Sequence, residues 1–420
     1  MSADRKRPDL MKATSLLWVG LAALLLAFLV GWLLAPGGSI PHAPVSASDY
    51  FNPALVERAQ DFRSERRLIA IGSMLAEFAA LAFLAFYRGP PLRGVLRWIQ
   101  SRRWLGAAVA GVGIVLVVAL IQLPFGLLSF DQGRDYGLVT QDRWAWFTDL
   151  LLSTLITGVM AAIGAMVAVW LWRRFRRRFW IAGSALVLVY AVLSVWLWPV
   201  VISPLFNDYT PLPAGPERTR VLELADQAGV DVGQVYEVDA SRRSSTLNAS
   251  VDGIGSSKRV VIYDNAINQL TDAELSALIA HELGHVESND LYRGLGFAIL
   301  VIPLGVLFVQ IGTTVLVRRR GDDETGPAIV PALALMIAVT SLVLAVPGNV
   351  LSRDIEAHAD EFSISLTGDP QGMIGLQQEL GRSNLTDPSP PGFYQYVFGT
   401  HPTILERIGA AEAAKSEEQK

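Results

Sequence analysis

Long uninterrupted runs of apolar residues dominate the pattern of this chain. A membrane-spanning helix needs about 20 mostly apolar residues, and seven stretches meet that requirement: about 14–35, 68–87, 105–128, 147–172, 180–200, 294–317 and 328–350. The composition agrees, because 51% of the residues are hydrophobic, only 18% are charged and the mean hydropathy is +0.37. The pattern therefore predicts a mainly α-helical, polytopic membrane protein.

The first apolar stretch also has an interpretation as a cleaved signal peptide. Basic residues precede it, and the small-residue sequence Val45-Ser46-Ala47 follows it. The apolar core of a signal peptide is normally about 7–15 residues long, and this stretch is longer. We therefore favour a spanning helix.

The chain between the fifth and sixth apolar stretches, about 201–293, has the alternating pattern of a water-soluble domain. The last of its predicted helices begins with a capping box, in which a threonine and a glutamate three residues later satisfy each other's backbone N–H groups. The predicted elements are a helix near 216–229, strands at Gln234–Asp239 and Arg259–Tyr263, and a helix from Thr271 to about Glu287.

We therefore expect four consecutive parts, of which the two water-soluble ones must meet to build one site. They are an N-terminal membrane domain of about five spanning helices (1–200), a water-soluble domain (201–293), two further spanning helices (294–350) and the C-terminal part of the same water-soluble domain (351–420).

The last predicted helix carries the motif His281-Glu282-Leu283-Gly284-His285, which uses two of only five histidines in the chain. Residues four apart lie on one face of a helix with about 3.6 residues per turn, so both rings can bind one zinc ion. Zinc lowers the pKa of a bound water to about 7, and Glu282 beside it can act as the general base. The motif therefore predicts a zinc metalloendopeptidase rather than an ordinary helix, with 201–293 and 351–420 as its peptidase domain.

A catalytic zinc ion normally takes three protein ligands and leaves a fourth position open. The chain has no cysteine, so the third ligand must be His, Glu or Asp. Glu356 and Asp360 lie four apart on one face of the helix expected to continue from the last span, which favours Glu356 as ligand and Asp360 as its support. Spacing alone leaves open that the acids of this segment form a solvated helix start: Asp354, Glu356, Asp360 and Glu361.

Lysine and arginine are unevenly divided between the two sets of loops that seven spans create. One set, which includes the N-terminus, holds seventeen and the other holds six. Basic short loops stay in the cytoplasm, so the peptidase domain is expected on the extracytoplasmic side of the cell membrane. The net charge of −4 argues against nucleic acid as a partner. The expected partners are the lipid bilayer and a peptide or membrane-protein substrate.

These motifs resemble those of the type I CAAX prenyl endopeptidases and their bacterial relatives, which are integral-membrane zinc metallopeptidases of the gluzincin clan. The likeness rests on the HELGH motif and on Ser352–Asp360 directly after a span, and it extends over about 201–410. The further similar segments are Ser203–Asn207 with Pro211-Leu212, Arg243–Ala249, Val260–Asp264, and Thr400-His401-Pro402 with Arg407.

The resemblance implies a role for each matching residue and a chamber in the membrane. His281, His285 and Glu356 would bind one zinc ion per chain, and Glu282 would be the base. Seven helices would wall a large water-filled chamber, capped by a small α+β zinc peptidase domain. The remaining roles are support of the ligands by Asp360 and Arg407, donation to the oxyanion by His401, and binding of the substrate backbone by Asn248.

The sequence leaves the substrate open. A processing enzyme with a defined cleavage motif and a broad-specificity quality-control peptidase for membrane proteins fit equally well, because sequence alone does not set substrate choice. No residue pattern indicates a prenyl-binding site. A non-enzymatic alternative is a seven-span transporter or scaffold with a structural HExxH helix, which a full set of ligands together with a base disfavours.

Overall fold

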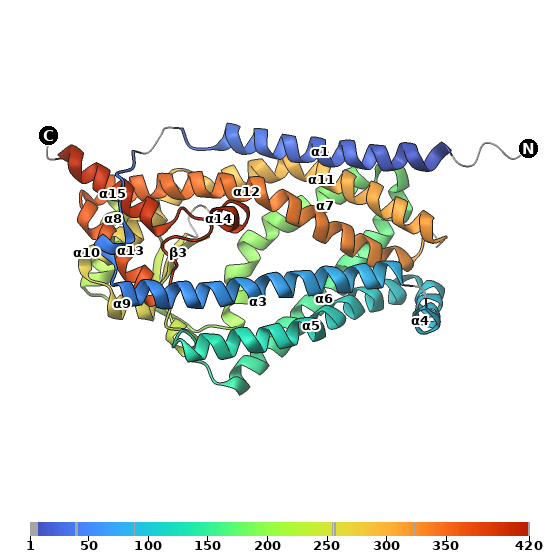
Figure 1. Ribbon diagram of the computed structural model, residues 1–420, viewed down its shortest axis with the longest axis horizontal. Helices are drawn as coiled ribbons and strands as arrows, with labels where there is room; N and C mark the ends of the chain where they lie inside the picture. The colour runs from blue at the N-terminus through green and yellow to red at the C-terminus, as the bar shows by residue number, and fades with distance from the viewer. Residues whose placement is uncertain are drawn as a thin grey trace, which may run out of the picture.

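A computed structural model describes residues 7–37, 41–87, 89–253, 255, 258–321 and 325–418. Of the basic residues used to predict the orientation, Arg5, Lys6 and Arg88 lie outside these ranges. The long helices run roughly along one axis of the molecule, and a small sheet with short helices lies at one end of that axis (Figure 1).

Six helical stretches among the described residues are long and apolar enough to cross a membrane. One of them, Arg143–Val195, has 53 residues and would be about 80 Å long if straight, far more than a bilayer requires. It consists of two helices that run in opposite directions, α6 (Arg143–Phe175) and α7 (Phe179–Leu197) (Figure 1). Counted separately, these two helices give the seven predicted spans.

The other five spanning helices, like these two, follow the predicted apolar stretches and extend beyond them at one or both ends. They are α1 (Arg7–Leu34), α3 (Pro53–Phe86), α5 (Arg103–Asp135), α11 (Asp290–Arg320) and α12 (Val330–Thr367). A short helix that we did not predict, α4 (Pro90–Ser101), lies at the end of the bundle far from the sheet (Figure 1).

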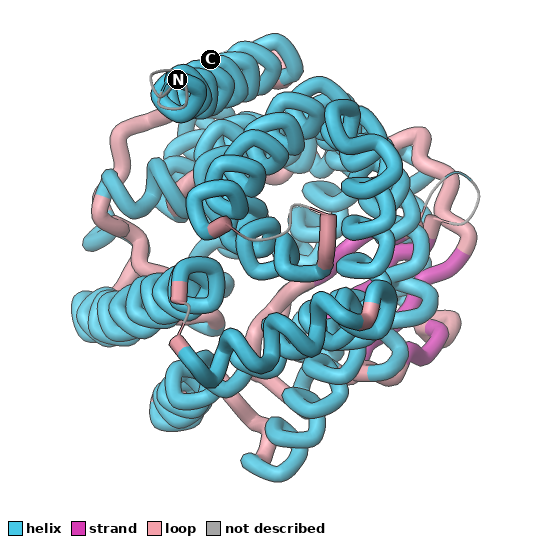
Figure 2. The backbone as a smooth tube through the Cα atoms, turned by 90° about the vertical axis from the view of Figure 1, so that its right-hand side faces the viewer, coloured by secondary structure: helices cyan, strands magenta, loops and turns pink. Residues whose placement is uncertain are grey.

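Seen along the long axis, the helices form a ring (Figure 2). A cavity of about 710 Å³ lies between α3, α5, α6 and α12, lined mostly by apolar side chains. Glu77 of α3 also lines this cavity and accepts a hydrogen bond from Gln122 Nε2 at 3.3 Å. This placement fits the cost of putting a carboxylate in hydrocarbon, which an interior position avoids.

Helix α1 is packed into the bundle along α11 and α12 (Figure 1). Ala27 and Val30 are buried against Val301 of α11. At the end of α1, Arg293 Nη1 donates to the carbonyl of Leu34 at 2.9 Å. This packing favours the spanning helix over a cleaved signal peptide.

The domain at the end of the bundle contains a four-stranded sheet in the order β1-β2-β4-β3. Strands β2 and β4 are parallel, and the two edge strands are antiparallel to their neighbours. The predicted elements of this domain all form within two residues of their expected ends. They are α8 (Pro216–Gln227), β2 (Gln234–Val238), β4 (Arg259–Tyr263) and α10 (Asp272–Glu287).

The remaining elements of this domain come from both sides of the last two spans, so the two water-soluble segments do meet. One apolar core joins them, with Ile262 of β4, Ile279 of α10 and Met373 of α13 fully buried. The elements not given above are α2 (Ala47–Tyr50), β1 (Tyr209–Pro211), β3 (Ala249–Asp252), α9 (Asp264–Gln269), α13 (Pro370–Ser383), α14 (Gly392–Phe398) and α15 (Ile404–Glu418).

Candidate active site

The HExxH motif lies on α10, which is fixed at its start by the predicted capping box. Thr271 N donates to Glu274 Oε2 at 2.8 Å, and Glu274 N donates to Thr271 Oγ1. Helix α10 packs closely on α12, because a Cβ at Gly284 would lie only 3.0 Å from Phe362. The motif's glycine thus allows the close approach that brings the histidines of α10 to the acids of α12.

Three side chains from these two helices converge as metal ligands would. His281 Nε2 lies 3.2 Å from Glu356 Oε2, and His285 Nε2 lies 3.8 Å from Glu356 Oε1. One ligand atom from each residue lies within 4.8 Å of the other two. Zinc–ligand bonds of about 2.0–2.1 Å place tetrahedral ligand atoms about 3.3 Å apart, so these separations suit one ion after small adjustments.

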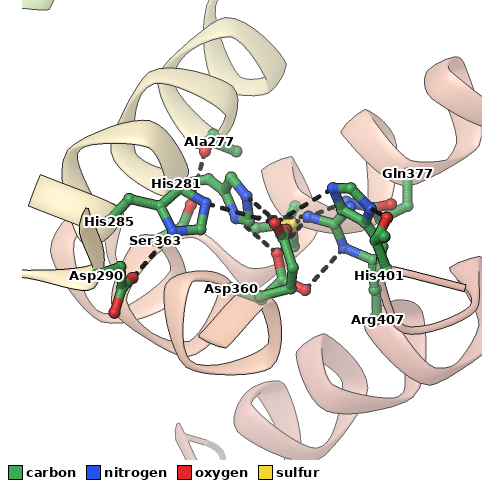
Figure 3. A network of polar contacts seen from close by, with 12 residues as sticks. Ala277, His281, His285, Asp290, Asp360, Ser363, Gln377, His401 and Arg407 are labelled. Atoms are coloured by element: carbon green, nitrogen blue, oxygen red, sulfur yellow. Dashed lines mark hydrogen bonds and ion pairs between the residues drawn. The ribbon is translucent and has the colours of Figure 1, made fainter. Parts of the chain in front are cut away.

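The outer nitrogens of both rings already have partners. His281 Nδ1 lies 2.9 Å from Asp360 Oδ1, and His285 Nδ1 lies 3.0 Å from Asp290 Oδ2 (Figure 3). A neutral ring that donates from Nδ1 has a lone pair on Nε2, and both lone pairs then face Glu356. Glu356 Oε2 is itself buried without a hydrogen-bond partner among the described residues. Lone pairs and a carboxylate converging in this way fit a cation between them.

The pKa values indicate the same preference for positive charge at this point. Burial lowers the pKa of His281, but the neighbouring carboxylates of Asp360 and Glu356 outweigh burial and raise the pKa to about 9. Burial raises the pKa of Glu356, but His281 outweighs it and the pKa is lowered. A metal ion bound between His281 and Glu356 would supply this positive charge in place of a proton.

Asp360 and Arg407 form a buried pair behind His281 (Figure 3). Arg407 Nε donates to Asp360 Oδ2 at 2.7 Å and Arg407 Nη2 donates to Oδ1 at 2.5 Å. Burial raises the pKa of Asp360, but Arg407 and His281 outweigh it and hold the pKa well below its usual range. Asp360 therefore stays ionised and keeps His281 in one orientation.

Glu282 lies in the same electrostatic environment without belonging to the ligand group. Burial raises its pKa, and the neighbouring His281 and His285 offset this only in part. A carboxylate whose pKa is raised is a stronger base than an ordinary exposed glutamate.

His401 faces the ligands from the loop between α14 and α15 (Figure 3). Its Nε2 lies 3.2 Å from Glu356 Oε1, and its Nδ1 is 2.8 Å from Thr400 Oγ1. Burial of part of the ring lowers the pKa of His401, although the side chain is 55% exposed. A mostly neutral ring with one face open can donate a hydrogen bond to a substrate.

Asn248 lies immediately before β3, which is an edge strand of the sheet. Its side chain is exposed, and its carbonyl accepts from Tyr263 N at 3.1 Å. Asn248 therefore lies at the start of an edge strand, and its described hydrogen bond goes to Tyr263 rather than to the histidines.

The sequence did not identify Asp290, the partner of His285. Asn289 adopts a left-handed conformation with φ 58, and this turn between α10 and α11 returns the next residue to the ring of His285. An aspartate five residues after the second histidine is the only sequence signal, and it is weak because the turn decides where the side chain points.

Asp354 and Glu361, the other acids of this segment, lie outside the group of possible ligands. Asp354 and His358 line a different cavity, together with Trp32 and His42. His358 Nδ1 lies 3.5 Å from Glu361 Oε2, which forms a separate pair. Of the acids near residue 356, the described part of the chain brings Glu356 alone to the two histidines as a possible third ligand.

Comparison with known families gives two matches that together cover most of the chain. Residues 213–415 match the model of peptidase family M48, and residues 40–208 match the model described as CAAX prenyl protease N-terminal, five membrane helices. The metalloprotease YhfN of Bacillus subtilis (strain 168) is 30% identical over 94% of this chain and 95% of its own.

Eukaryotic proteins are similar over a smaller share. A CAAX prenyl protease 1 homolog of Oryza sativa subsp. japonica is 29% identical over 73% of each chain. The crystal structure of S. mikatae Ste24p superposes with a TM-score of 0.76 at 21% identity, covering 94% of this chain and 98% of that one. The fold therefore matches. The match of residues 213–415 to peptidase family M48, together with the 30% identity to a metalloprotease, shows that the transporter or scaffold alternative is wrong.

Proposed function

This chain belongs to peptidase family M48, and we propose that its metal is one zinc ion held by His281, His285 and Glu356. Two imidazoles and a carboxylate with a fourth position left open form a common donor set of catalytic zinc. When bound, the metal acidifies water and polarises the substrate carbonyl. The observation that carries the proposal is the convergence of two ring nitrogens on Glu356, with their outer nitrogens already held by Asp360 and Asp290.

The other side chains of the site have separate roles in peptide hydrolysis. Glu282 takes a proton from the attacking water and later passes it to the leaving amine. His401 donates from its exposed ring to the oxygen that becomes negative in the transition state, a contribution of about 3 kcal/mol in comparable sites. Asp360 and Arg407 hold His281 in orientation.

The substrate backbone is bound at the edge of the sheet. Strand β3 pairs with β4 on one side only, so a peptide in extended conformation can add to its other side by main-chain hydrogen bonds. Asn248, at the start of β3, contributes its side-chain amide to that peptide. This mode of binding depends little on side chains, which suits both a processing enzyme and a quality-control peptidase.

Glu282→Gln tests the base. The three ligands remain, so the purified variant should keep its zinc by metal analysis and lose at least about 100-fold in peptide hydrolysis. Substrate peptides for this assay are chosen by digesting an unfolded protein with the wild-type enzyme and mapping the cleavage sites. Hydrolysis at the wild-type rate would refute the role of Glu282.

Glu356→Ala tests the third ligand. Two histidines alone leave the metal under-coordinated, so zinc occupancy should fall, whereas Asp354→Ala in the separate cavity should retain it. The opposite result would show that the wrong carboxylate was assigned.

We further propose that the zinc site lies on the extracytoplasmic side of the membrane. The basic segments near residues 97–103, 173–178 and 318–320 lie at the end of the bundle opposite α10 (Figure 1), and basic residues near span ends are retained inside. Several of the arginines at the zinc end have structural partners instead. These include Arg58 with the Tyr136 carbonyl, Arg67 with Asp387 and Arg143 with Asp131.

The chain has no cysteine, so single cysteines report the orientation directly. Gln269 is exposed at the end of the bundle that carries the zinc site, and Ser101 is exposed at the opposite end. We therefore choose Gln269→Cys and Ser101→Cys. A membrane-impermeant thiol reagent on intact cells should label residue 269 and leave residue 101 unlabelled until the cells are opened. The reverse pattern would place the zinc site in the cytoplasm.

A further inference from the structure

One arginine of α12, Arg353, ties this helix to the end of α14, which lies against it (Figure 1). Arg353 comes three residues before the proposed ligand Glu356, and residues three apart are neighbours on the surface of a helix. Arg353 Nη1 donates to the carbonyl of Gly399 at 2.5 Å. The same atom lies 3.3 and 3.4 Å from the carbonyls of Gln395 and Tyr396, which belong to the last turn of α14.

An arginine suits this position for a general physical reason. The last carbonyls of a helix have no partner within the helix and carry its negative end. A guanidinium group is always charged and offers several N–H donors in one plane. Asn349, also on α12, adds a second contact by donating to the carbonyl of Val397 at 2.7 Å. Both contacts are to backbone carbonyls, so they fix the path of the chain at the end of α14.

The chain that leaves α14 at this point carries His401 two residues after Gly399. It passes close to Gln395, because a Cβ at Gly399 would lie 2.5 Å from the carbonyl oxygen of Gln395. The side chain of Gln395 donates to the carbonyl of His401 at 2.6 Å. The ring of His401 in turn lies 3.2 Å from Glu356 Oε1. These contacts close a ring that starts and ends on α12, at Arg353 and at Glu356.

We propose that Arg353 is a positioning residue that sets the place of His401 relative to the zinc ligands. Its guanidinium group is engaged by α14, so it acts through His401 rather than on the substrate. An oxyanion donor is effective only where the charge develops, and a displacement of about 1 Å can cost about 100-fold in rate. This inference rests on the proposed peptidase function and on the role of His401 in it.

The experiment compares kcat and KM of the purified full-length enzyme on one peptide that the wild type cleaves. Arg353→Gln should lower kcat by about 10–100-fold and leave KM within about 3-fold. Zinc occupancy should stay at the wild-type level, because the three ligands are intact. Arg353→Lys keeps a cation near the same carbonyls but lacks the planar fork, so it should restore part of kcat.

Arg382→Gln is the control, because Arg382 is an exposed arginine that pairs with Glu379 on α13. It should leave kcat, KM and thermal unfolding unchanged. Thermal unfolding of Arg353→Gln is measured alongside, and a fall of kcat that unfolded protein explains entirely would overturn the proposal. A parallel loss of zinc and activity would also overturn it, because Arg353 would then act on Glu356 rather than on His401.

A double-mutant cycle with His401→Ala separates positioning from a general effect on the fold. His401→Ala should lower kcat by about 100–1000-fold. Once the donor is gone its position no longer matters, so adding Arg353→Gln should lower kcat by less than about 3-fold further. Multiplication of the two losses in the double variant would overturn the proposal. Glu282→Gln is assayed in parallel, and activity retained in that variant would instead contradict the proposed peptidase function.

Discussion

Replacing Asp290 should weaken metal binding without unfolding the protein. Asp290 Oδ2 holds His285 Nδ1 at 3.0 Å, and its side chain is only 9% exposed. Partners of this kind fix the orientation and tautomer of a ligating histidine, and their loss typically lowers metal affinity by about 10–100-fold. This corresponds to about 1.4–2.7 kcal/mol.

The two obvious substitutions at this position should differ in size. Asp290→Asn keeps an oxygen that can still accept from His285, so we expect a loss near about 10-fold, whereas Asp290→Ala removes the acceptor and should approach about 100-fold. The neighbouring Arg293 loses an ionic contact at 3.3 Å but still donates to the carbonyls of Leu34 and Ser288. The local fold should therefore persist.

The assay is zinc competition between the detergent-purified protein and a fluorescent chelator at pH 7. Glu287→Gln, which changes an exposed carboxylate at the end of the same helix, is the control. An unchanged zinc Kd in Asp290→Ala would refute the role of this aspartate. A loss of affinity that simply follows a loss of thermal stability would assign it a structural role instead.

Two further predictions follow from the packing around α10. The pKa of Asp360 is depressed in the folded state, so its contribution to stability is full above the unfolded value of about 3.9 and is lost as the pH falls through the folded value. Thermal unfolding of the metal-free protein should therefore depend less on pH below about 4 in Asp360→Asn than in the wild type; equal slopes would contradict the pairing. Gly284→Val should separate α10 from α12 at Phe362, lowering both stability, by about 1–3 kcal/mol, and zinc occupancy. Gly294→Val is the control, because a Cβ at Gly294 meets nothing within 4 Å. Equal effects of the two substitutions on stability and zinc occupancy would contradict the role of close packing at Gly284.

Local sequence patterns predicted the helices whose ends and faces depend on neighbouring residues in the sequence. The capping box at Thr271 and the spacing of His281 and His285 defined α10 and one face of the site. Apolar length defined the spans because a bilayer requires it. Strand β1 has only three residues and forms through its pairing with β2, which no periodicity within so short a segment could indicate.

The side chains that approach from distant segments were harder to predict. Spacing on one helix face favoured Glu356 and Asp360, but only packing of α12 on α10 brings them to the histidines. His401 and Arg407 were expected from family resemblance alone, because nothing in the residues around them specifies contact with α10. Asp290 was missed because a left-handed residue, Asn289, decides its direction.

Helix α12 fixes the height of the site above the membrane, because it carries both the last span and Glu356 without interruption. Glu356 comes six residues after position 350, where the predicted apolar stretch ends, which corresponds to about 9 Å along a helix. We therefore expect the scissile bond to lie just outside the apolar layer. A segment anchored in the bilayer reaches that height with a short extended stretch, at about 3.3 Å per residue. We therefore expect the enzyme to prefer membrane-attached substrates over soluble ones, whichever cleavage motif it recognises.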